Sequence, residues 1–217
     1  FDSFGENLNQ QTGATSFSWT DIDIPGNNSL PVRLQRSLIV EDKYQASSGG
    51  LHDFGDSDTM DLDVPYIKGT YGPDGWQVNN ADPNARCTFG NKSPNSYSGG
   101  NIQSHDYWGG NWLHVPWAGD QEVLGSPDAS IQKAGSAPLM TRNQWAFECL
   151  PTTKNGYPGE AFIAISPQGE RYYFDWVITQ ATSGVSKRYG NYSHSTASIS
   201  RQIVFFLVTK IEDRFGN

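Results

Sequence analysis

Apolar and polar residues alternate with a period of two in the clearest segments of the chain. In residues 30–40, one set of alternate positions is largely apolar and the other is mostly polar. This is the period of a strand with one buried face. The preceding segment, Phe17–Ile24, also alternates but changes phase at Asp21, which indicates a β-bulge. Because residues 25–28 (Pro-Gly-Asn-Asn) have turn chemistry, residues 15–41 are predicted to form a hairpin of two long strands.

Further strands follow along the chain. The compact turn Ser166–Glu170 predicts a second hairpin, and the wholly apolar run Ile203–Val208 predicts a strand buried on both faces. One short helix is expected to start at Ser126 and end at Gly135. Residues 80–125 show no clear period and are expected to form long ordered loops. The predicted strands cover residues 64–71, 145–150, 161–166, 171–179 and 198–211.

The composition agrees with this pattern. Charged residues make up 18% and aromatic residues 13%, with 23 Gly and 12 Pro, which suits many short strands joined by tight turns. The fold class is therefore predicted as all-β: an antiparallel β-sandwich or distorted barrel with long Gly- and aromatic-rich loops and at most one short helix. Residues 1–217 are expected to form a single module. Because residues 211–217 have the pattern of a strand entering a turn, this module is expected to belong to a longer chain.

Charge and cysteine content restrict the possible partners and the cellular compartment. A formal net charge of −8 argues against nucleic acid as a partner, and no apolar run is long enough to insert into a membrane. Cys87 and Cys149 are predicted to form a disulfide, with two separate buried thiols as the alternative. A disulfide favours a secreted or cell-surface protein.

Arg36 and an Asp-rich stretch raise the question of a metal. Arg36 falls on the apolar side of its strand, where a buried guanidinium needs a carboxylate partner. The aspartates that follow are expected to supply it and to cap turns. Calcium is the alternative, although the spacing departs from the EF-hand loop, and no other cofactor is expected. The aspartates are Asp53, Asp56, Asp58, Asp61 and Asp63.

Catalytic motifs are not found in the sequence. It contains no nucleophile elbow, zinc-protease motif, phosphate loop or dinucleotide fingerprint. The four histidines have no metal-ligand spacing on a recognisable element. The chain is therefore predicted not to be an enzyme.

Residues 97–117 form the strongest candidate site. Aromatic rings can stack on the apolar face of a sugar while Asn, Asp and His bond its hydroxyls, and nearby glycines let a ligand approach the backbone. The alternative is that these rings fill the core or cover a sheet edge, the commoner role of Trp in an all-β domain. The candidate residues are Tyr97, Asn101, His105, Asp106, Tyr107, Trp108, Asn111, Trp112 and Trp117.

Four segments, taken in order, resemble the region that precedes the repeats of RHS/YD-repeat proteins, which are large secreted or surface proteins and polymorphic toxins, mostly bacterial. The resemblance implies a non-enzymatic N-terminal module attached to a downstream RHS/YD shell in the same chain, with a surface glycan as a further partner. The alternative is a carbohydrate-binding module of a polysaccharide-degrading enzyme. The segments are Thr12-Gly13-Ala14 with Thr20–Ser37, Asp61–Ile67, Ile165–Gly169 with Tyr173-Phe174-Asp175, and Ile211–Asn217.

Overall fold

The chain divides into two compact units, Phe1–Val64 and Pro65–Asn217, and each is described by itself. No low-complexity linker marks this boundary, which is why the sequence predicts a single module. The computed structural model describes residues 6–8, 15–24, 32–40, 61–62, 64–90, 92–116, 118–125, 139–190 and 195–217.

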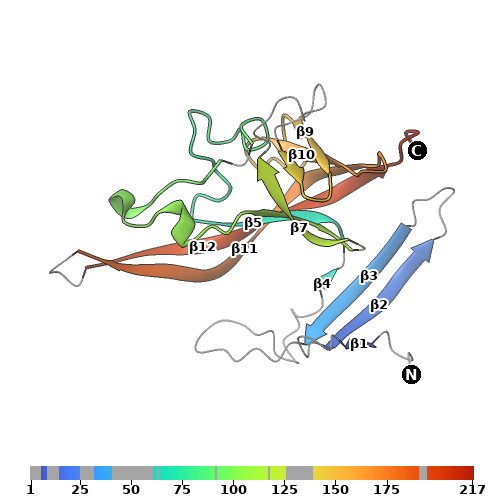
Figure 1. The fold of residues 1–217 in the computed structure, drawn as a ribbon, viewed down its shortest axis with the longest axis horizontal. Helices are drawn as coiled ribbons and strands as arrows, with labels where there is room; N and C mark the ends of the chain where they lie inside the picture. Colours follow the sequence, from blue (N-terminus) through green and yellow to red (C-terminus); the bar gives the residue numbers. More distant parts are fainter. Residues whose placement is uncertain are drawn as a thin grey trace. The chain divides into compact units, whose positions relative to one another are not determined.

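The first unit contains a four-stranded antiparallel sheet in the order β1-β2-β3-β4 (Figure 1). β2 and β3 form the predicted hairpin, and their register shifts between Thr20 and Ile22, where the alternation changes phase. Both the hairpin and the bulge are therefore confirmed. The strands are β1 (Glu6–Leu8), β2 (Thr15–Ile24), β3 (Val32–Val40) and β4 (Asp61–Leu62).

Arg36 pairs with a carboxylate of the neighbouring strand. Its Nε and Nη2 each donate to Asp21 at 2.6 Å, and these bonds lower the pKa of Asp21. Asp21 is the extra residue of the bulge, and bulges re-aim side chains in this way. The Arg36 side chain is 42% exposed, so the prediction of a buried guanidinium is wrong.

The second unit is a closed barrel of eight antiparallel strands in the order β10-β11-β12-β5-β6-β7-β8-β9. Closure leaves each strand with one face inside and one outside. The prediction of an all-β antiparallel fold is confirmed. Of the sandwich and the barrel that were expected, the second unit forms the barrel. The strands are β5 (Tyr66–Tyr71), β6 (Asn111–Val115), β7 (Gly119–Gly125), β8 (Leu139–Thr141), β9 (Ala146–Leu150), β10 (Ala161–Ile165), β11 (Arg171–Tyr189) and β12 (Ser195–Glu212).

Five of these strands correspond to predicted ones, and the turn after Ile165 joins β10 to β11 as predicted. The sequence did not indicate β6, β7 or β8. β6 and β7 lie inside the region where only loops were expected, and β7 is rich in Gly, Asp, Gln and Glu, which have low strand propensity. Pairing with neighbours in the closed barrel is what makes such a segment a strand.

Helical structure is limited to short turns in the described part of the chain. The 3₁₀ turns are Ser98–Gly100 and Ser104–Asp106. The helix predicted between Ser126 and Gly135 lies outside the described residues. Across the described ranges, no helix is long and apolar enough to cross a membrane.

β11 and β12 continue beyond the barrel as a two-stranded arm (Figure 1). β10 pairs with β11 only as far as Phe174, and β5 pairs with β12 only from Gln202. The pairing of β11 with β12, however, continues to Tyr189 and Ser195. We use "arm" for residues 182–189 and 195–201.

Aromatic side chains fill the barrel. The rings of Phe162 and Phe206 lie 5.2 Å apart, and Trp76, from the connection between β5 and β6, lies 5.5 and 5.3 Å from them. All three side chains are buried. An eight-stranded barrel has an interior just wide enough for side chains, so the inserted Trp76 completes its core.

Arg86, on the same connection, is 1% exposed. Its guanidinium lies over the rings of Tyr157 and Phe206, at 5.2 and 5.4 Å, and donates to the carbonyl of Pro158. Burial lowers the pKa of Arg86. Gly159 has a φ of 96°, and a Cβ there would clash with Arg86 Nη2, so this close approach requires glycine.

The predicted disulfide between Cys87 and Cys149 is present. It joins the connection that carries Trp76 and Arg86 to β9. Next to it, Glu160 accepts hydrogen bonds from the backbone nitrogens of Cys87 and Thr88 at 2.9 and 2.8 Å. The connection is thus fastened to the barrel wall by a covalent bond and by a carboxylate.

Replacing both cysteines should destabilise the barrel. The disulfide spans 62 residues, and the chain-entropy model assigns about 4 kcal/mol to a loop of that length. We therefore expect the Cys87→Ser/Cys149→Ser variant to lose about 4 kcal/mol of unfolding free energy, measured by urea denaturation. An unchanged midpoint, or two reactive thiols in the denatured, unreduced wild-type protein, would contradict this.

Candidate binding surface

Three of the predicted aromatic residues, Tyr97, Tyr107 and Trp108, belong to or pack against one buried cluster. The Tyr107 ring is 4% exposed and packs with Ile102 and with Ala197 of the arm, while Tyr97 and Trp108 lie against this cluster. A buried ring offers no face to a sugar. For Tyr107 the prediction of a binding platform is therefore wrong, and core packing is its role.

Asn111 is also buried and serves the core. Its Oδ1 accepts a hydrogen bond from the hydroxyl of Tyr71, and Trp108 Nε1 donates to it at 3.4 Å. Burial raises the pKa of Tyr71 well above its usual value, so the hydroxyl stays protonated and can donate. The prediction of Asn111 as a ligand for sugar hydroxyls is wrong.

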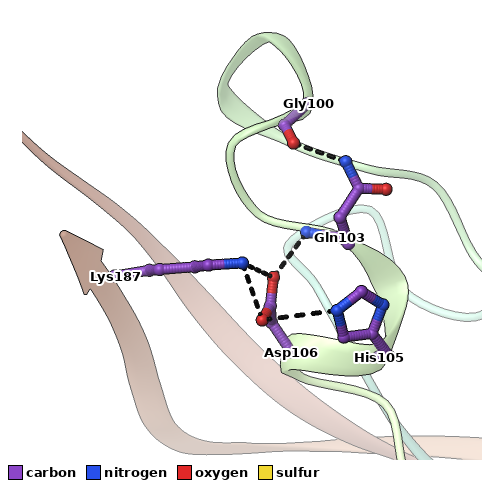
Figure 2. Close-up of polar contacts among 5 residues, drawn as sticks. All are labelled: Gly100, Gln103, His105, Asp106 and Lys187. Carbon is purple, nitrogen blue, oxygen red and sulfur yellow. Dashed lines mark hydrogen bonds and ion pairs between the residues drawn. The ribbon is translucent and has the colours of Figure 1, made fainter. Parts of the chain in front are cut away.

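Asp106 fastens this stretch to the arm (Figure 2). Lys187 Nζ donates to both of its carboxylate oxygens, at 2.9 and 2.7 Å, and the backbone nitrogen of Gln103 donates at 2.8 Å. The bond from Lys187 lowers the pKa of Asp106. His105 is largely exposed, with Nε2 3.8 Å from Asp106. The Asp106 carboxylate is thus held by structural partners.

Asn101 serves its own turn, and several other predicted residues lie outside the described ranges. Asn101 donates to the carbonyl of Ser98 at 2.7 Å within its own turn. Trp117 lies outside the described residues, and the backbone alone is described for Asp61. In the ranges that the structure describes, no three His, Cys, Asp or Glu are grouped to hold a metal, and the calcium hypothesis stays a prediction. Asp53, Asp56, Asp58 and Asp63 also lie outside the described residues.

Trp112 differs from its neighbours because it lies on the outer face of the barrel. Burial alternates along β6: Leu113 and Val115 are buried, while Trp112 and His114 are half-buried. Directly paired residues of adjacent strands point to the same side of a sheet. The strand registers therefore show which other side chains share this outer face.

Two rows of side chains cross five strands on that face, and we call them the outer wall. Adjacent strands lie about 4.8 Å apart, so each row is roughly 19 Å long. In the order β11, β12, β5, β6, β7, one row is Trp176, Leu207, Tyr66, His114 and Asp120, and the other is Ile178, Phe205, Lys68, Trp112 and Glu122.

The outer wall presents aromatic and aliphatic surface. Trp176 is 46% exposed and Ile178 is similarly exposed. The Tyr66 ring stacks on His114 at 4.5 Å and meets Phe205 edge-on at 5.4 Å. Contiguous apolar surface on a protein commonly marks a binding site.

This surface was not predicted from the sequence, because the run Ile203–Val208 is apolar throughout. Val204 and Phe206 point into the barrel and are fully buried, but Phe205 and Leu207 are half-buried. The prediction of burial on both faces is therefore wrong for the outer face. A strand that is apolar throughout can have both faces covered or one face partly exposed. The strand register shows which of the two applies.

Charged groups at the β6–β7 end of the outer wall hold one another in place. Asp120 lies 2.7 Å from His114 Nδ1 and 3.2 Å from Lys68 Nζ. The hydrogen bond with His114, together with Lys68, lowers the pKa of Asp120. Burial opposes the charge on Lys68, but Tyr66 and Asp120 outweigh it and the pKa of Lys68 is raised. Lys68 and Asp120 are therefore ionised at neutral pH.

No family model, curated protein or solved structure matches the chain. The resemblance to RHS/YD-repeat proteins therefore stays a prediction.

Tyr107 and Trp176 should respond differently to truncation. Removing a buried aromatic ring costs about 3–5 kcal/mol, so Tyr107→Ala should lower the unfolding free energy by about 3 kcal/mol. Trp176→Ala should lower it by less than about 1 kcal/mol, because half of that ring is already in water. Urea denaturation of both variants measures this, and equal losses would show that the two rings are not buried as described.

Acid should remove the contribution of Asp120. Its folded pKa lies below the unfolded value of about 3.9, so the carboxylate stabilises the fold above that pH and ceases to do so as the pH falls through the folded pKa. Because the side chain is 43% exposed, we expect Asp120→Asn to cost less than about 1 kcal/mol at pH 7. The difference from wild type should shrink as the pH falls through the folded pKa and vanish below it. A difference that is constant or grows on acidification would contradict the assignment.

Proposed function

We propose that the chain is a non-enzymatic binding module that holds a polysaccharide on the outer wall. The observation that carries this proposal is the exposed Trp176, which continues in register into half-buried Leu207 and Tyr66 across a closed barrel. Trp112, from the originally predicted site, belongs to the same surface.

The chemistry of the outer wall suits a sugar. Aromatic rings offer large apolar area and little rotamer entropy to lose, and they stack on the apolar faces of pyranose rings. Lys68, Asp120 and Glu122 stand among the rings and can bond hydroxyl groups. Rows of roughly 19 Å accommodate several consecutive sugars of an extended chain. The rings stand on strands that are already paired. Binding therefore costs little further conformational entropy.

The shape of the surface supports binding without catalysis. The outer face of a closed barrel is convex, whereas catalytic sites are concave and exclude water. Lys68 and Asp120 are also already paired with each other.

We further propose that the module works in an exported protein. The disulfide supports an oxidising compartment, such as the cell surface or the extracellular medium. The four segments that resemble RHS/YD-repeat proteins add the proposal that the module joins a downstream shell of that type in the same chain.

Loss of the Trp176 ring should weaken binding strongly and leave the fold intact. We expect the wild-type protein to be retained on at least one insoluble polysaccharide of a broad panel, and Trp176→Ala to bind at least tenfold more weakly with an unchanged melting temperature. The matched control is Trp19→Ala, because Trp19 is 51% exposed but belongs to the first unit and is not one of the residues of the outer wall. Retention of the wild type on no polysaccharide, or equal effects of the two variants, would refute the proposal.

A further inference from the structure

The outer wall is electrically asymmetric. Its β7 end carries Asp120 and Glu122. The segment from Trp176 to Ile211, which supplies its β11 and β12 positions, contains four Lys or Arg and no Asp or Glu. All 23 acidic residues of the chain lie elsewhere.

This segment is an exception in an acidic protein. Residues 1–64 contain eleven of the 23 acidic residues and three of the 15 basic ones, so they carry the whole formal charge of −8. Residues 65–217 contain twelve of each kind. A net negative charge repels an anionic ligand, and a segment that has basic but no acidic residues opposes that repulsion locally.

Arg201 extends the outer wall on this cationic side. It lies on the same side of β12 as Ile203 and Phe205, because alternate residues of a strand share a face. Arg201 precedes Phe205 by four positions, which places it roughly 13 Å further along the strand. Paired with Thr182 at the base of the arm, Arg201 forms the end of the surface that is remote from Asp120.

The guanidinium of Arg201 is held in place, yet it has no carboxylate partner in the described ranges of the chain. Its Nε donates to the carbonyl of Ser183 at 2.7 Å, and its Nη2 donates to the Ser183 hydroxyl at 3.2 Å. Lys187 and Lys210 of the same hairpin pair with Asp106 and Glu212. Arg201 is thus a fixed cation whose charge is not neutralised by a described carboxylate.

We propose that the polysaccharide held on the outer wall is anionic and that Arg201 binds its carboxylate or sulfate groups. This inference rests on the proposed function. A planar guanidinium matches an oxyanion with directed hydrogen bonds, and anchoring by Ser183 reduces the entropy lost on binding. Sugar rings stack on Trp176, Phe205 and their neighbours. Asp120 and Glu122 disfavour anionic groups at the far end of the outer wall.

The test compares polymers that share a backbone and differ in charge. Dextran with dextran sulfate tests for sulfate, and fully methyl-esterified polygalacturonate with polygalacturonate tests for carboxylate. In affinity electrophoresis at 0.15 M salt, we expect the wild type to bind one anionic member at least tenfold more tightly than its neutral counterpart.

Arg201→Gln and Arg188→Gln form a matched pair of variants. Each removes one positive charge from the same hairpin, and Arg188 also has no carboxylate partner among the described residues. Arg188, however, pairs with Thr196, on the opposite face from Arg201. We expect Arg201→Gln to lose most of the preference for the anionic polymer and Arg188→Gln to keep it, with melting temperatures confirming that both variants fold.

The outcomes separate the two proposals. If the neutral polymers bind as tightly as the anionic ones and Trp176→Ala abolishes that binding, the anionic ligand is refuted and the proposed function stands. If Arg201→Gln and Arg188→Gln weaken binding equally, the attraction is diffuse and the role of Arg201 is refuted. If the wild type binds no polysaccharide of any kind, both proposals fail.

Discussion

Closure of eight strands into a barrel is the constraint on which the second unit depends. In a closed barrel, every strand turns alternate residues toward the interior and toward the outside. The interior is filled by rings such as Trp76, Phe162 and Phe206, with the Cys87–Cys149 disulfide holding the connection that supplies Trp76. Side chains that meet a large ligand therefore belong to the outer face or to segments beyond the barrel, and the outer wall and the arm are those places.

The hairpin of β11 and β12 links the two aromatic regions of the second unit. Its arm packs against part of the predicted site, where Ala197 packs on Tyr107 and Lys187 pairs with Asp106. Nearer the barrel, the same two strands carry Trp176 and Phe205 on the outer wall. Aromatic residues thus have two different roles here. Tyr107 and its neighbours pack against the arm of the hairpin, whereas Trp176 and Phe205 project from the hairpin on the outer wall.

Features set by neighbouring residues could be predicted from the sequence. The hairpin of residues 15–41, its bulge near Asp21 and the turn after Ile165 all follow from local alternation and turn chemistry. β7 could not be predicted, because its polar sequence becomes a strand only through pairing with distant partners. The burial of Tyr107 and the exposure of Trp176 could not be predicted either, because each depends on which face of a strand another segment covers.

The indole N–H signals of the seven tryptophans can show where a ligand binds, because each reports on its own surroundings. In a two-dimensional ¹H–¹⁵N titration with a soluble oligosaccharide of the polymer that is retained, we expect shifts for Trp176 and Trp112 on the outer wall. The signals of Trp76 and Trp145 in the barrel core should not move. Shifts confined to Trp108, with Trp176 unaffected, would contradict the account and return the binding site to the segment around Tyr107.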